Sequence, residues 1–161
     1  RSSNKFKILI VDDNENNLFT LRTLISKHLD VEILEASSGQ EAVDTAIKSP
    51  DIDLIILDIQ MPEMDGFQAA SMLKIRKRTK EIPIIFLTAA FKSEEFQEKG
   101  YAVGAADYLV KPISLPRFLK YVDRVSTFYI IKKNISDNNQ FSFFPILTGL
   151  HIIYIEIDYV G

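Results

Sequence analysis

Residues 54–66 read LIILDIQMPEMDG, a continuous apolar run that ends on one aspartate and leads into a segment rich in Pro, Met and Gly. Such an unbroken apolar run is typical of a central strand in a parallel sheet, covered on both faces. A carboxylate at the end of this strand loses hydration, so Asp58 needs a hydrogen-bond, charge or metal partner in compensation. The rest of the sequence should therefore show which groups lie near Asp58.

The composition is typical of a soluble globular chain with one domain and room for an appended segment. The chain has 161 residues, of which 47% are hydrophobic and 25% are charged. A formal net charge of -3 gives no reason to expect nucleic acid as the direct partner. The absence of cysteine excludes disulfide and thiolate chemistry and fits a reducing compartment.

Strand-like and helix-like stretches alternate from residue 5 to about residue 126. Five βα units with short connections predict an α/β fold, a doubly wound parallel sheet of five strands with helices on both faces. The strands are expected at 6–11, 31–36, 53–57, 82–87 and 106–110. The helices are expected at 14–28, 38–47, 67–78, 93–103 and 115–125.

Two local signals refine these elements. Ser38 is expected to cap its helix, with Glu41 three positions later completing a capping box. Pro83 has no amide hydrogen to donate, so it is expected near the start of its strand.

Polar side chains follow four of the five expected strands. In an open parallel sheet, functional groups gather at the carboxyl ends of the strands, beside a topological switch point. We therefore expect these side chains to lie near one another. They are Asp12 and Asp13, Asp58, Thr88, and the pair Lys111 and Pro112.

Three carboxylates at one sheet edge repel one another, and a divalent cation would resolve that conflict. The all-oxygen set formed by Asp12, Asp13 and Asp58 favours Mg²⁺ over zinc or copper. Beside such an ion Asp58 could act as a nucleophile toward phosphorus, because carboxylates form aspartyl phosphates. Phosphoryl transfer mainly requires charge neutralisation on the phosphoryl oxygens, for which Thr88 and Lys111 would supply a hydroxyl and an ammonium group.

Four stretches and their spacing closely resemble the receiver domain of two-component response regulators. They are VDDNENN at 11–17, ILDIQMPEMDG at 56–66, FLTAA at 86–90 and GAADYLVKP at 104–112. The resemblance covers residues 5–126, which we interpret as one receiver domain. It implies a flavodoxin-like receiver fold with strand order 2-1-3-4-5.

The resemblance implies a role for each matching residue at the metal site. Asp58 would be the phosphoacceptor and would also contact Mg²⁺. Asp13 would bind the ion directly and Asp12 through water, with the backbone carbonyl of Gln60 as a further ligand. The side chains of Gln60 and Ala90 occupy the positions at which the family tunes its rate of self-dephosphorylation.

The resemblance also implies a conformational switch. Lys111 would contact the phosphoryl group, and its peptide bond to Pro112 is expected to be cis. Thr88 would move toward the phosphoryl group and Tyr108 would follow it inward. The surface formed by the fourth helix, fifth strand and fifth helix (93–125) would then change partner or form a homodimer.

A receiver takes its phosphoryl group from a phosphohistidine on a histidine kinase or a histidine phosphotransfer domain. The chain would catalyse its own phosphorylation and dephosphorylation at Asp58 without being a conventional multiple-turnover enzyme. We expect it to be cytoplasmic, or to be the cytoplasmic part of a larger membrane-bound sensor. His28 and His151 do not resemble phosphodonors, so the donor is expected on another chain or domain.

Other functions fit the sequence less well. Each residue alone has a simpler interpretation, such as a helix cap for the Asp pair or a core position for Tyr108. A haloacid-dehalogenase-like phosphatase would need a second carboxylate where Gln60 stands. An FMN-binding flavodoxin would need a phosphate loop where the chain has the acidic DDNEN (12–16). A degenerate receiver that only docks is disfavoured because every phosphorylation residue is present.

Two segments are not explained by the resemblance. The basic stretch KIRKRTK (74–80) could contact nucleic acid, but we interpret it as a solvated helix end. Residues 127–161 contain a linker-like segment and two strand-like runs. They could be a fragment of a neighbouring domain, a non-native extension, or an edge strand added to this sheet or exchanged with a second copy. Their polar residues argue against a membrane span.

Overall fold

A computed structural model of the chain describes residues 5–88, 107–110, 116, 118 and 153–155. For 107–110 and 153–155 it describes the backbone alone. The expected helices at 93–103 and 115–125 lie outside the described residues, except for positions 116 and 118. The elements are β1 (Phe6–Val11), α1 (Glu15–His28), β2 (Val31–Ala36), α2 (Gly39–Lys48), β3 (Leu54–Asp58), α3 (Gly66–Lys74), β4 (Ile84–Thr88), β5 (Asp107–Val110) and β6 (Ile153–Ile155).

The sheet is parallel throughout and has the order β2-β1-β3-β4-β5-β6. The order predicted for the first five strands is therefore confirmed. A sixth strand, Ile153–Ile155, pairs with Asp107–Val110 at the edge, which agrees with one of the alternatives given for residues 127–161. A strand edge presents unpaired backbone groups, and the tail supplies a strand that hydrogen-bonds to them.

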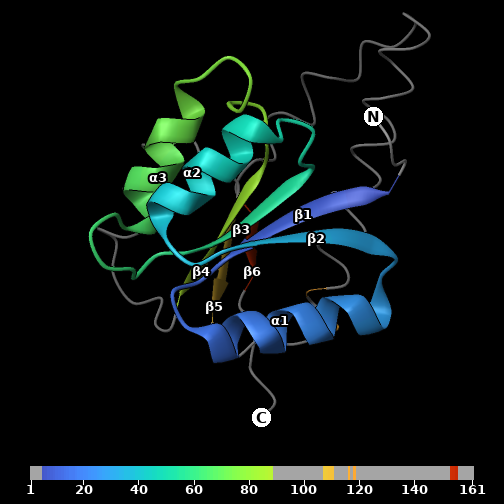
Figure 1. Cartoon of the computed structure of the whole chain (residues 1–161). Helices are drawn as coiled ribbons and strands as arrows, with labels where there is room; N and C mark the ends of the chain where they lie inside the picture. Colours follow the sequence, from blue (N-terminus) through green and yellow to red (C-terminus); the bar gives the residue numbers. More distant parts are fainter. Residues whose placement is uncertain (1–4, 89–106, 111–115, 117, 119–152, 156–161) are drawn as a thin grey trace, which may run out of the picture.

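Helices cover both faces of the sheet, with α2 and α3 on one face and α1 on the other (Figure 1). Side chains alternate between the faces along each strand, so every central strand contributes to two cores. Leu9, Ile55 and Phe86 face α2 and α3, whereas Ile8 and Ile56 face α1. Strands β3 and β4 are buried along their whole length, as expected for strands covered on both faces.

Phe118 joins the core on the α1 face and is fully buried there. Within the described residues, no helix has the length and apolar character needed to cross a membrane.

Helix α1 begins after Asn14, and α2 begins after the predicted cap Ser38, although one detail of that cap was wrong. Asn14 caps α1, and its side chain accepts hydrogen bonds from the backbone of Asn16 and Asn17. The Ser38 side chain accepts a hydrogen bond from the amide of Glu41 at 3.1 Å, as predicted. The Glu41 carboxylate, however, accepts from the amide and hydroxyl of Ser37, so the capping box is not closed at Ser38.

Helix α3 ends at Lys74, four residues earlier than predicted. Residues 75–82 form a turn instead, in which one side chain binds a carbonyl that a continuing helix would use and another holds the end of the turn. The Thr79 hydroxyl donates to the Leu73 carbonyl at 2.7 Å, and the Lys74 ammonium donates to the Ile82 carbonyl at 2.8 Å. Pro83 precedes β4, whose paired residues begin at Ile84 rather than at position 82.

Lys74 provides a test of this turn through its ionisation. Burial lowers the pKa of Lys74 to about 8, whereas the carboxylate of Glu81 acts in the opposite direction. Its pKa in the unfolded chain is near 10.5, so the unfolded state binds more protons between about pH 8 and 10.5. Across this pH range the folded protein loses the charged form of Lys74, which burial disfavours. The stability of the protein should therefore rise with pH through it.

We expect Lys74→Met to remove this rise, because methionine keeps the aliphatic stem without an ionisable group. The measurement is the free energy of urea unfolding for both proteins at several values between about pH 7.5 and pH 10.5. The exposed Lys77 supplies the control, since Lys77→Met should retain the pH dependence of the parent. Equal pH dependence in the parent and Lys74→Met would show that Lys74 does not titrate in this range.

Candidate functional site

The candidate site lies where β1, β3 and β4 end, at one edge of the sheet. Asp12 follows β1, Asp58 is the last residue of β3, and Thr88 is the last residue of β4. In the sheet Val11 is aligned with Leu57, and Asp58 with Leu87. The register therefore brings these strand ends side by side, as the sequence predicted.

Three carboxylates meet at this edge. One oxygen from each of Asp12, Asp13 and Asp58 can be chosen so that all three lie within 4.8 Å of one another. Asp12 and Asp58 are 1% and 5% exposed, whereas Asp13 is exposed to solvent. Two buried charges at this separation repel by about 3 kcal/mol at an effective dielectric constant of about 20. The arrangement is therefore suited to a cation.

The local structure fixes Asp12 through both of its carboxylate oxygens. Oδ1 accepts from the backbone amide of Asn14 at 2.9 Å, and Oδ2 accepts from Nδ2 of Asn17 at 3.2 Å. Asn14 also begins α1, so the helix start and the orientation of Asp12 depend on the same residue.

Asn17 is a site residue that the sequence analysis missed. It lies within the VDDNENN motif, but its type does not distinguish it from the neighbouring Asn16. The available signal was its position in the first turn of the helix, from which a side chain can reach back to Asp12. Asn16, by contrast, is exposed.

The loop after β3 is held close to Asp58. The amide of Gly66 donates to the Ile59 carbonyl at 2.8 Å. A Cβ atom at Gly66 would clash with the Asp58 carbonyl oxygen and would lie 2.9 Å from the Ile59 Cα. Only glycine fits this approach without displacement. Asp65 caps α3 and forms a capping box with Gln68. Earlier in the loop, Glu63 adopts the left-handed backbone conformation, with φ of 67°.

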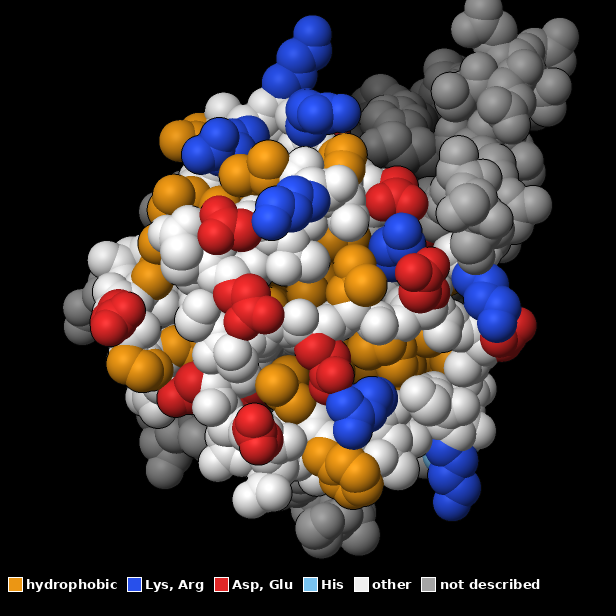
Figure 2. All heavy atoms as spheres, in the orientation of Figure 1, with side chains coloured by type: hydrophobic (Ala, Val, Ile, Leu, Met, Phe, Trp, Pro, Cys, Tyr) orange, Lys and Arg blue, Asp and Glu red, His pale blue; other side chains and the backbone are white. Residues whose placement is uncertain are grey.

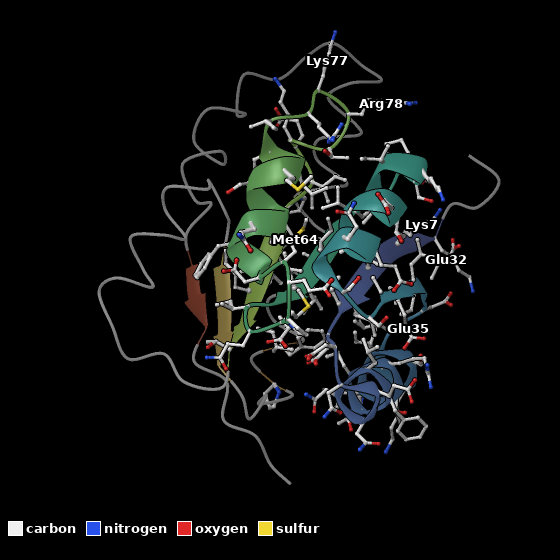
Figure 3. The ribbon with its side chains drawn as sticks, turned by 60° about the vertical axis from the view of Figure 1, so that its left-hand side comes forward. Lys7, Glu32, Glu35, Met64, Lys77 and Arg78 are labelled. Carbon is white, nitrogen blue, oxygen red and sulfur yellow. The ribbon has the colours of Figure 1, made fainter. Side chains whose placement is uncertain are left out.

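The same loop contacts α2 through Met64. Met64 lies between α2 and α3 (Figure 3) and packs against the core on that face. A Cβ atom at Gly39 would lie 2.7 Å from the Met64 carbonyl oxygen. The first residue of α2 therefore supports the loop that returns to Asp58.

The remaining predicted residues are only partly described. Thr88 is 2% exposed, and its backbone is aligned with Val110, the residue before Lys111. Lys111 and Pro112 lie outside the described residues, as do Ala90 and the side chain of Tyr108. Gln60 lies two residues beyond the strand end and is exposed.

The described groups define the chemistry available. They offer oxygen ligands alone, from side chains whose positions are fixed by strand ends and by a helix cap. Carboxylate and carbonyl oxygens suit hard cations such as Mg²⁺, which keeps several waters and leaves positions for phosphate oxygens. Asp58 stands beside that site on the end of a buried strand, which suits a nucleophile held in a fixed orientation.

Comparisons with known proteins agree with this geometry. The family model described as the response regulator receiver domain matches residues 8–123. A Staphylococcus aureus relative, transcriptional regulatory protein SrrA, is 45% identical over 112 residues, covering 67% of this chain and 42% of that protein. A Vibrio cholerae relative named "Probable cyclic di-GMP phosphodiesterase" is 38% identical over 109 residues, covering 68% and 24%. The chain thus spans less than half the length of these curated relatives.

Solved structures match over nearly their whole length. Vibrio cholerae chemotaxis protein CheY4 has a TM-score of 0.69 and 34% identity, covering 75% of this chain and 98% of that one. The receiver domain of a Pseudomonas aeruginosa sensor histidine kinase, with magnesium in its active site cleft, has a TM-score of 0.68 and 27% identity, covering 74% and 96%. The chain therefore belongs to the response regulator receiver domain family of two-component signalling.

Proposed function

We propose that this chain is a Mg²⁺-dependent phosphoacceptor in which Asp58 receives the phosphoryl group. Receiver domains take phosphoryl groups from histidine kinases or phosphotransfer proteins, and this chain would use a donor of that kind. The observation that supports the proposal most directly is the convergence of Asp12, Asp13 and Asp58 within 4.8 Å. One of these carboxylates by itself would not support the proposal.

The residues present fit a magnesium ion. Asp13 and Asp58 would bind it directly, the backbone carbonyl of Gln60 would add a third oxygen, and Asp12 would act through water. The fixed orientation of Asp12 supports this indirect role, because Asn14 and Asn17 already occupy its two oxygens. A bound Mg²⁺ would neutralise the carboxylates and the phosphoryl oxygens that enter the site.

Asp58 would form the new bond in the transfer. Its carboxylate oxygen attacks phosphorus while the phosphorus–nitrogen bond of the phosphohistidine breaks. The electron pair of that bond stays on the imidazole nitrogen. The imidazole leaves as the neutral base because its other ring nitrogen already carries a proton, or because it takes one from solvent as the bond breaks. Asp58 becomes an acyl phosphate, and the Thr88 hydroxyl and the Lys111 ammonium donate to the oxygens of the transferred group.

The signal would leave the site through the neighbouring strand ends. Thr88 and Lys111 would be drawn toward the phosphoryl group and Tyr108 would move inward behind Thr88. The parallel pairing of β4 with β5 supports this route, because Thr88 is the last residue of β4 and Tyr108 lies on the adjacent strand β5. The surface 93–125 would then favour a different partner or a second copy of the chain. We place this relay in the cytoplasm, within a receiver unit at 5–126.

Asp58→Asn tests the assignment of the phosphoacceptor. Incubation of the parent with acetyl phosphate or phosphoramidate and Mg²⁺ should add one acid-stable, alkali-labile phosphate, measured by intact mass. Asp58→Asn should add none, because the amide is a poor nucleophile. Asp44→Asn is the matched control and should be labelled like the parent, since Asp44 is exposed on α2. Full labelling of Asp58→Asn would refute the site.

Asn17→Ala tests how Asp12 is positioned. Loss of the Asn17 hydrogen bond frees one oxygen of Asp12, so the affinity of the unphosphorylated protein for Mg²⁺ should fall about tenfold or more. Calorimetric titration with Mg²⁺ measures this directly, and circular dichroism shows whether the fold is retained. Asn16→Ala removes a similar amide from the same helix turn and should leave the affinity unchanged. Equal Mg²⁺ affinities in the two variants would exclude this role for Asn17.

A further inference from the structure

The turn that follows α3 concentrates positive charge. We call residues 75–80 the basic turn: it contains Ile75 and the four cations Arg76, Lys77, Arg78 and Lys80. It carries four of the 19 Lys and Arg residues of the chain and none of the 22 Asp and Glu residues. Since the whole chain has a net charge of -3, the remainder carries -7. The basic turn is therefore a local concentration of positive charge on a chain whose other residues carry a net negative charge.

The basic turn has a fixed shape. The Thr79 side chain is buried, and its hydroxyl binds the Leu73 carbonyl at 2.7 Å. The Lys80 amide donates to the Arg76 carbonyl at 2.8 Å. From beneath the turn, the ammonium of Lys74 donates to the carbonyls of Lys80 and Ile82. The backbone is therefore preformed before any partner arrives.

The cations of the basic turn are directed into solvent. All four are exposed, and none of them forms an ion pair with another described residue. Lys5, Lys7 and Arg22 differ, because each of these lies against a carboxylate at 2.8 to 2.9 Å. Figure 2 shows Lys and Arg side chains gathered at the top of the molecule, where the turn lies in Figure 1.

An aliphatic side chain stands uncovered beside these cations. Ile75 is 83% exposed, and Phe19 is the other large hydrophobic side chain that is exposed in the described part of the chain. Phe19 makes a cation–π contact with Arg22, whose guanidinium lies 5.5 Å from the ring centre. Removing Ile75 from water would be favourable in any complex that covers the turn.

The basic turn lies away from the carboxylate site. It precedes β4, whose far end is Thr88, and a strand of this length spans about 17 Å. A partner on the turn would therefore approach the edge of the sheet opposite to Asp58. Both positions could be used at the same time.

We propose that the basic turn docks on an anionic lipid bilayer, with Ile75 entering the interface and the four cations contacting headgroups. Lys77 and Arg78 point in divergent directions at the tip of the turn (Figure 3), and a bilayer, whose anions diffuse laterally, can pair with both. A folded acidic protein would need a matching concave surface. A nucleic acid would gain no stacking from Ile75, and the turn has no aromatic side chain to provide it.

The test is sedimentation of the whole chain with vesicles of phosphatidylcholine, either pure or with about one third phosphatidylglycerol. The protein should bind only the anionic vesicles, and added salt should release it. Each basic residue near such a surface contributes about fivefold, so the double variant Lys77→Gln/Arg78→Gln should bind about 25-fold more weakly. Ile75→Ser should weaken binding severalfold even though it changes no charge.

The matched control is Lys27→Gln/Lys48→Gln, which makes the same change of net charge on α1 and α2 and should bind like the parent. Asp58→Asn should also bind like the parent, so the docking and the phosphoacceptor proposals can fail separately. Three results would overturn the docking proposal: no binding to the anionic vesicles, equal losses in the two double variants, or tighter binding to an oligonucleotide than to the vesicles.

Discussion

The carboxylates of Asp12 and Asp58 must be compensated at the ends of buried strands, and the rest of the site follows from that requirement. Each lies in a position that excludes most water, so its charge is stable only beside donors or a cation. The backbone and side-chain amides of α1 supply donors to Asp12. For Asp58, the adjacent Asp12 and Asp13 make a hard cation the natural counter-charge.

The parallel sheet makes this convergence possible without placing polar groups in the hydrophobic cores. Parallel pairing aligns the ends of β1, β3 and β4 in one register, while the alternating side chains of the same strands fill two separate cores. The apolar rows that hold the strands in place are therefore distinct from the polar groups at their ends. Substitution at the edge can alter chemistry while the interior of the sheet remains packed.

The sequence predicted the features that depend on periodicity and missed those that depend on tertiary contact. The acidic cluster followed from apolar runs that end in polar residues, and the strand order from the resemblance to receiver domains. The end of α3 was wrong, because residues 75–78 favour a helix and the stop comes from Thr79 folding back on Leu73. Glu41 reached Ser37 rather than Ser38, and Asn17 had the same residue type as the exposed Asn16. The end of a helix and the partner of a polar side chain both depend on which groups the folded chain brings near them.

Gly66 brings the backbone at the start of α3 into direct contact with the backbone of Asp58. With no side chain at this position, the first residue of the helix rests directly on the peptide group of Asp58 and is tied to Ile59 by a hydrogen bond. Little free space separates the two backbones, so a small displacement of the strand end must be transmitted to the helix. Asp65 and Gln68 lock the first turn, so α3 would respond as a rigid rod. Helix α3 is thus in direct backbone contact with the end of the strand that carries Asp58, at a place separate from Thr88.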